Sequence, residues 1–108
     1  MAAEEQGALT EGVYYILLAL HEPRHGYAIM QGVQELTKDR VILGPGTLYG
    51  ALSTLVEKGW IRAYSDDQSS RRKDYLITDQ GKSAFQTELE RLEELLVHGK
   101  LVQGSERT

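Results

Sequence analysis

Residues 44–61 read Gly44-Pro-Gly-Thr-Leu-Tyr-Gly-Ala-Leu-Ser-Thr-Leu-Val-Glu-Lys-Gly-Trp-Ile61 and predict a helix with well-defined ends. Gly44 can adopt a cap conformation, and Pro45 suits the first helical position, where no backbone N–H is needed. Gly59 is expected to end the helix in a left-handed conformation. An apolar stripe at helical spacing would face the core, and it consists of Leu48, Leu52, Leu55 and Val56.

The opposite face of this helix is rich in small residues and hydroxyl groups. These residues are Gly46, Thr47, Gly50, Ser53, Thr54 and Glu57, with Tyr49 at the flank. A solvent-exposed face usually carries Lys, Glu and Gln, which are better helix formers. Small residues let a helix approach another surface closely, so this face is typical of a helix that lies in a groove.

The composition sets limits on compartment and size. A chain of 108 residues is expected to form one domain with a modest core. The lack of cysteine excludes a disulfide framework and fits a reducing cytoplasm. Residues 1–8 include Glu4 and Glu5 and do not resemble a secretory leader. The longest apolar run, residues 13–20, is too short to span a bilayer, so we expect a cytoplasmic protein without a membrane partner.

The net charge of −4 is unevenly distributed along the chain. Residues 1–23 carry four acidic groups and no lysine or arginine, whereas residues 24–82 carry nine basic groups against seven acidic ones. Residues 83–108 carry three basic groups against five acidic ones. The basic part of the chain therefore contains the central helix.

Two further helices are predicted before the central one. The first covers residues 9–20, is apolar nearly all round and ends before Pro23, so it needs burial on two sides, one of them supplied by a partner chain. The second begins near Gly26 and runs to Leu36, followed by a polar turn over residues 37–40 and a short strand over residues 41–43. This order indicates a helix-turn-helix, although a plain three-helix bundle has the same pattern.

A β-hairpin is predicted directly after the central helix. Residues 61–64 and 73–77 are β-type runs on either side of a turn-rich polar loop, an arrangement typical of a wing. Arg71, Arg72 and Lys73 sit together where the loop rejoins its return strand, which suits contacts with DNA phosphates or the minor groove. The alternative is that these cations protect an edge strand from aggregation.

A long helix is predicted over residues 79–98, with Thr78 as its cap. Phe85, Leu89, Leu92 and Leu96 repeat at spacings of four, three and four, as in a coiled-coil seam. So long a helix overhangs so small a domain, and dimerisation would use the surplus. Gly99 is expected to stop the helix. The predicted organisation is therefore a flexible N-terminus at 1–8, a winged helix-turn-helix domain at 9–78, the dimerisation helix at 79–98 and a flexible tail at 99–108.

Four segments together resemble the PadR family of bacterial transcriptional regulators, in the family's order. They are His25-Gly-Tyr27, Gly46-Thr-Leu-Tyr-Gly-Ala-Leu52, Leu55-Val-Glu-Lys-Gly-Trp-Ile61 and Arg71-Arg-Lys-Asp-Tyr-Leu-Ile-Thr-Asp-Gln-Gly81. The short chain is similar to the family's compact branch, which has a single C-terminal dimerisation helix. The resemblance implies a mainly α fold with a small β-hairpin, and a homodimeric winged helix-turn-helix repressor that binds a palindromic DNA operator and often responds to a small aromatic or drug-like effector.

The resemblance also implies roles for individual residues. The residues expected to contact DNA are Gly46, Thr47, Tyr49, Gly50, Ser53 and Lys58 in the recognition helix, Arg71, Arg72 and Lys73 in the wing, and Tyr27 at the start of the supporting helix. The dimer interface is expected to include Tyr15, Phe85, Leu89, Leu92 and Leu96.

An effector site at the dimer axis is a further expectation. Its lining would consist of Tyr14, Tyr15 and Leu18 with Leu92 and Leu96 of the second copy, because mixed small and aromatic residues suit a planar apolar ligand. The alternative is a filled core. Some compact relatives stack ligands on a tryptophan of the last helix, whereas the one tryptophan of this chain, Trp60, follows the recognition helix.

Enzymatic chemistry is not indicated by any motif. His21, His25 and His98 lack metal-ligand spacing, and no serine or threonine is accompanied by a base with its orienting partner. We therefore expect no catalytic residues, metal or cofactor. A different class of function remains as an alternative, namely a winged helix that docks on a partner protein instead of DNA.

Overall fold

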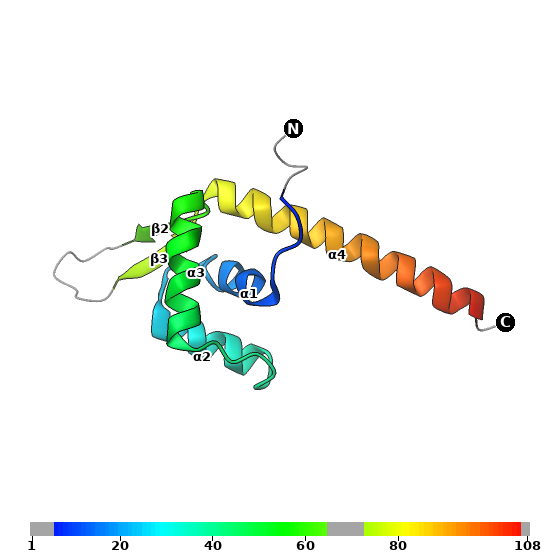
Figure 1. Ribbon diagram of the computed structural model, residues 1–108, viewed down its shortest axis with the longest axis horizontal. Coiled ribbons are helices and arrows are strands. Elements are labelled where there is room, and N and C mark those ends of the chain that lie inside the picture. Colours follow the sequence, from blue (N-terminus) through cyan, green and yellow to red (C-terminus); the bar gives the residue numbers. More distant parts are fainter. Residues whose placement is uncertain (1–5, 65–72, 107–108) are drawn as a thin grey trace.

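The computed structural model describes residues 6–64 and 73–106. Its elements are α1 (Glu11–Ala19), β1 (Arg24–His25), α2 (Gly26–Leu36), α3 (Pro45–Lys58), β2 (Ile61–Tyr64), β3 (Asp74–Ile77) and α4 (Asp79–Glu106). Figure 1 shows α1, α2 and α3 gathered together, with the β2–β3 hairpin on one side and α4 leading away on the other. This arrangement confirms the predicted fold class, a mainly α winged helix-turn-helix with a long last helix.

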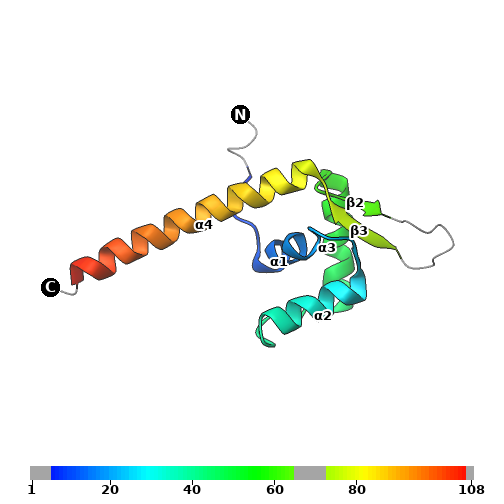
Figure 2. The same ribbon diagram turned by 180° about the vertical axis from the view of Figure 1, so that it is seen from behind.

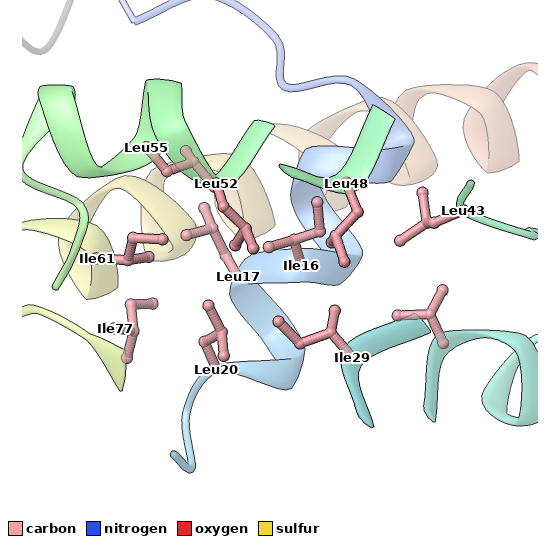
Figure 3. Close-up of a cluster of buried hydrophobic side chains, with 11 residues drawn as sticks. Ile16, Leu17, Leu20, Ile29, Leu43, Leu48, Leu52, Leu55, Ile61 and Ile77 are labelled. Atoms are coloured by element: carbon pink, nitrogen blue, oxygen red, sulfur yellow. The ribbon is translucent and has the colours of Figure 1, made fainter. Parts of the chain in front are cut away.

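The core lies where the first three helices meet the hairpin (Figure 3). Ile16 and Leu17 from α1, with Leu20 directly after it, face the buried stripe of α3. The opposite view in Figure 2 shows α1 between α2 and α4. The other members of this cluster are Ile29, Val33, Leu43, Leu48, Leu52, Leu55, Ile61 and Ile77. The α3 stripe is narrower than predicted, because Val56 lies at its edge and is 44% exposed.

The predicted ends of α3 are confirmed. Gly44 takes an extended cap conformation before Pro45, and Gly59 ends the helix with φ at 78°. At the start of α1, the hydroxyl of Thr10 accepts a hydrogen bond from the Val13 N–H at 3.1 Å. The helix boundaries therefore follow from local capping chemistry.

The sheet has a strand that the sequence analysis did not predict. β1 pairs with β3, so the antiparallel order is β1-β3-β2, and Arg24 lies opposite Tyr75. The predicted strand at residues 41–43 is wrong. Thr37 holds that segment in a turn, since its hydroxyl accepts a hydrogen bond from the Val41 N–H at 3.0 Å, and Leu43 turns into the core.

A compact joint connects the end of α3 to the start of α4. The Thr78 N–H donates to the Trp60 carbonyl at 2.9 Å, and the Thr78 hydroxyl donates to the Gly59 carbonyl at 2.6 Å. The same hydroxyl accepts from the Gly81 N–H at 3.0 Å, which confirms the predicted cap at Thr78. A side chain at Gly81 would overlap the Trp60 carbonyl oxygen, so glycine permits this close approach.

α4 is longer than predicted. It continues through Gly99 to Glu106, so the predicted helix end at Gly99 is wrong. A glycine inside a helix costs only about 1 kcal/mol relative to alanine, and the surrounding residues favour helix. The radius of gyration is 16.4 Å, whereas about 13 Å is expected for a compact domain of this length, because α4 extends beyond the core.

We predict opposite effects for alanine at two glycines of α4. Gly81→Ala should lower the free energy of unfolding by about 3 kcal/mol, because a backbone oxygen cannot move away from the new methyl group. Gly99→Ala should raise it by about 0.5–1 kcal/mol, because no neighbour lies within 4 Å of its added carbon and alanine favours the helix. Urea denaturation of the two variants and the parent measures both effects, and equal effects would contradict the close approach at the joint.

Candidate nucleic-acid interface

The outer face of α3 is open to solvent. Leu48, Leu52 and Leu55 hold the helix on the core, while the residues predicted to contact DNA in α3 are all exposed. They are Gly46, Thr47, Tyr49, Gly50, Ser53 and Lys58. Side chains added at Gly46 or Gly50 would meet no neighbour within 4 Å. This face is therefore shallow enough for close approach to a large ligand.

Two tyrosines border this face. Tyr49 is 49% exposed, and its ring lies against Gly26 at the start of α2. Tyr27 follows in the first turn of α2 and is 60% exposed. Both side chains therefore form the edge of this face, with the Tyr49 hydroxyl directed toward α2.

Cationic groups flank the C-terminal end of α3. The Lys58 ammonium lies 4.9 Å from the centre of the Trp60 ring, a cation–π contact that leaves the residue exposed. Lys73 is exposed directly before β3, whereas Arg71 and Arg72 lie outside the described residues. Arg62 in β2 is also exposed, with its guanidinium carbon 5.7 Å from the centre of the Tyr64 ring.

Arg62 was not among the predicted site residues. The signal that could have identified it is its place in the strand, because the residue after the buried Ile61 is expected on the opposite face of the sheet. β2 follows α3 directly in the chain, and Figure 1 shows the β2–β3 hairpin next to α3. Such a placement suits a contact with a phosphate group.

Other arginines of the domain are held in contacts within the fold. The Arg24 side chain donates to the Ala19 carbonyl at 2.9 Å and to the Glu22 carboxylate at 3.3 Å. Arg40 donates to the Glu11 carboxylate at 2.5 Å and so lowers the pKa of Glu11. These contacts join α1 to β1 and to the turn before α3.

A family model for PadR-like transcriptional regulators matches residues 15–87. This chain belongs to the PadR-like family of transcriptional regulators. The matched region extends from α1 through the hairpin into α4. The family contains regulators and not enzymes, which confirms that part of the prediction.

Solved structures of regulators share the fold. A PadR-like transcription factor from Bacteroides fragilis has a TM-score of 0.70 and 28% identity, with coverage of 83% of this chain and 87% of that one. A PadR-family regulator from Eggerthella lenta has a TM-score of 0.66 and 28% identity, with coverage of 83% and 80%.

Two curated proteins are similar in sequence. A Lysinibacillus sphaericus protein designated X is 38% identical over 74 residues, which are 67% of each chain. A 37.1 kDa protein of transposon TN4556 from Streptomyces fradiae is 35% identical over 74 residues. The match spans 68% of this PadR-like chain but only about a fifth (20%) of that relative.

The predicted effector site combines two copies of the chain, and three of its residue positions also lie together within one copy. Tyr14, Tyr15 and Leu92 line a cavity of about 300 Å³ between α1 and α4. Leu18 and Leu96 do not line it. Tyr14 stacks on Phe85 of the same chain, with ring centres 4.9 Å apart. Burial, followed by the charges of Tyr15 and Glu88, raises the pKa of Tyr14.

A buried carboxylate closes the polar side of this cavity. Glu88 is 2% exposed and accepts hydrogen bonds from Arg91 at 2.6 and 2.9 Å and from the Leu9 N–H at 3.3 Å. Gln6 donates to the Ala84 carbonyl nearby, so residues 6–10 lie along α4. The hydrogen bond from Arg91 is the main cause of the lowered pKa of Glu88.

Residues 6–64 and 73–106 offer neither a membrane-spanning helix nor a metal-binding cluster. No helix in these ranges combines the length and apolar character that a membrane crossing requires. The same ranges hold no group of three His, Cys, Asp or Glu side chains arranged to bind a metal ion.

We predict that Glu88→Gln destabilises the fold in a pH-dependent way. At neutral pH the free energy of unfolding should fall by about 1–3 kcal/mol, because Arg91 loses a charged acceptor. The pKa of Glu88 is lowered by folding, so its stabilising effect is present above the unfolded pKa of about 4.3 and is lost as the pH falls through the folded value. Denaturation of both proteins from pH 7 to pH 3 should therefore show the difference shrinking toward acid pH. A constant difference would contradict this role of the charge.

Proposed function

We propose that this PadR-like chain is a homodimeric repressor that binds an inverted-repeat DNA operator through α3 of each copy. The observation that carries the proposal is the outer face of α3, where small and hydroxyl-bearing residues are exposed, together with the exposed Arg62 and Lys73 in the hairpin segment that follows it. A two-fold dimer would present two such helices about 34–36 Å apart, which is one turn of B-DNA. Symmetric half-sites follow from that symmetry.

The proposed roles within α3 differ by chemistry. Thr47 and Ser53 have hydroxyl groups that can reach base edges, while Gly46 and Gly50 allow the backbone to approach the DNA. Lys58, Arg62 and Lys73, with Arg71 and Arg72 of the wing, would contact phosphates. Tyr27 would contact the backbone from α2. Phosphate contacts give affinity and orientation, whereas base contacts give specificity.

The apolar surface of α4 supports dimerisation. Leu89 and Leu92 are more than a third exposed, and Leu95, Leu96 and Val97 are about half exposed. So many exposed apolar side chains on one helix mark a protein interface. We assign this face to a second copy, with Tyr15 and Phe85 of α1 and α4 at its inner end.

Repression and the response to an effector are the most detailed parts of the proposal. A dimer that occupies a promoter would exclude RNA polymerase, and this is the route to repression that we propose. The cavity lined by Tyr14, Tyr15 and Leu92 offers ring surfaces to a planar effector, and its charged residues, Glu11, Glu88 and Arg91, would face polar groups of that ligand. Such a ligand releases DNA only if it binds the DNA-free arrangement of the dimer more tightly than the DNA-bound one.

Selection of bound sequences from a pool of random duplexes tests the proposed function. The expected result is an inverted repeat whose half-site centres are about 10–10.5 base pairs apart. Enrichment of single, unpaired half-sites would contradict the dimeric arrangement. If no sequence is enriched and binding to random duplex DNA is absent even at low salt, the winged helix serves as a protein-interaction module, which the net charge of −4 favours.

We predict that two substitutions distinguish residues that contact base edges from residues that contact phosphates. Ser53→Ala should weaken operator binding by about 1–3 kcal/mol and leave binding to random DNA unchanged, because a base-edge contact is lost. Arg72→Ala should weaken both and lower the salt dependence by about one unit. Fluorescence anisotropy at several salt concentrations measures these effects, and identical profiles for the two variants would contradict the division of roles.

We predict that the double variant Leu89→Gln, Leu92→Gln disrupts the dimer, because it replaces two apolar residues of α4 that are more than a third exposed. Light scattering should report a monomer. Operator affinity should fall because a monomer binds only one half-site through a single α3 helix. The matched control is Thr87→Gln, Glu94→Gln, which changes two exposed positions of the same helix outside the hollow that Leu89 and Leu92 line. A dimer that persists in the leucine variant would show that another surface holds the copies together.

A further inference from the structure

The first residue of α2 has no side chain, and a side chain of α3 occupies that space. A Cβ built on Gly26 would lie 2.7 Å from Cζ and 2.9 Å from Cε1 of Tyr49, and it would overlap the phenol oxygen. Gly26 is buried, and its φ is not positive. Alanine could therefore adopt this backbone conformation, so the requirement at residue 26 is for space.

The contact joins the two helices of the helix-turn-helix at a sensitive place. Tyr49 is the fifth residue of α3, and the N-terminal part of a recognition helix is the part that contacts base edges. The ring is 49% exposed, so one side rests on α2 and the other borders the outer face of α3. Its position therefore decides how much of that face is clear.

We propose that Gly26 is a positioning residue for DNA readout, an inference that rests on the proposed function. Its bare backbone seats the Tyr49 ring against α2, which keeps the ring out of the space that DNA must enter. A methyl group at residue 26 displaces the ring. Because the ring is half exposed, it moves outward instead of breaking the core, and it then obstructs the close approach that Gly46 and Gly50 permit.

A double-mutant cycle, measured by DNA binding, tests the contact between Gly26 and Tyr49. The four proteins are the parent, Gly26→Ala, Tyr49→Ala and the double variant, and the readouts are affinity for the selected operator, affinity for random duplex and melting temperature. Gly26→Ala should weaken operator binding at least about 10-fold while random-duplex binding changes less than about 2-fold. In the Tyr49→Ala background the same substitution should have no further effect, because the displaced ring is gone.

Gly32→Ala is the matched control, since it adds the same methyl group to the same helix where nothing lies within 4 Å. It should bind the operator like the parent. If Gly26→Ala lowers the melting temperature as well, the double variant should restore it, because it removes the overlap. Parent-like operator binding by Gly26→Ala, or an equal loss with and without Tyr49, would overturn the inference.

A measurement without DNA separates this inference from the proposed function. With 3-fluorotyrosine incorporated, the ¹⁹F resonance of Tyr49 is assigned by its absence in Tyr49→Phe. Gly26→Ala should shift that resonance, and Gly32→Ala should not. An unshifted resonance in Gly26→Ala overturns the inference that Gly26 positions the Tyr49 ring, even if the protein binds its operator. A parent that does not discriminate operator from random DNA overturns the proposed function and with it the role in readout, while the resonance still decides whether Gly26 seats Tyr49.

Discussion

The hydrogen bonds of Thr78 to the carbonyl groups of Gly59 and Trp60 are the constraint on which the rest of the structure depends. They attach the start of α4 to the end of α3, and Gly81 lets the two backbones approach closely. The α4 helix therefore leaves the domain in a direction fixed by α3 itself. In a dimer held through α4, the orientation of each recognition helix would then be set by one short, rigid connection.

The features that the sequence predicted are those decided by local chemistry. The ends of α3 follow from Gly44, Pro45 and Gly59, and the cap of α4 follows from Thr78, because each needs only neighbours within one turn. The hairpin strands were likewise evident from two β-type runs around a polar loop.

The features that were missed depend on partners far away in the chain. β1 has only two residues, and it exists because β3, about fifty positions later, supplies its hydrogen bonds. The packing of Tyr49 on Gly26 joins different helices, so spacing within either helix could not reveal it. Gly99 illustrates a different difficulty, since a glycine can end a helix or lie within it, and its neighbours decide which. Arg71 and Arg72 remain sequence-based assignments.

Trp60 gives the joint an optical property of its own. It is the only tryptophan in the chain, and it lies between the end of α3 and β2, packed against the core with the Lys58 ammonium over its ring. Its indole emission therefore originates at one place, the connection between the recognition helix and α4. The native protein thus contains a spectroscopic reporter for changes in that connection, and no label has to be introduced to observe them.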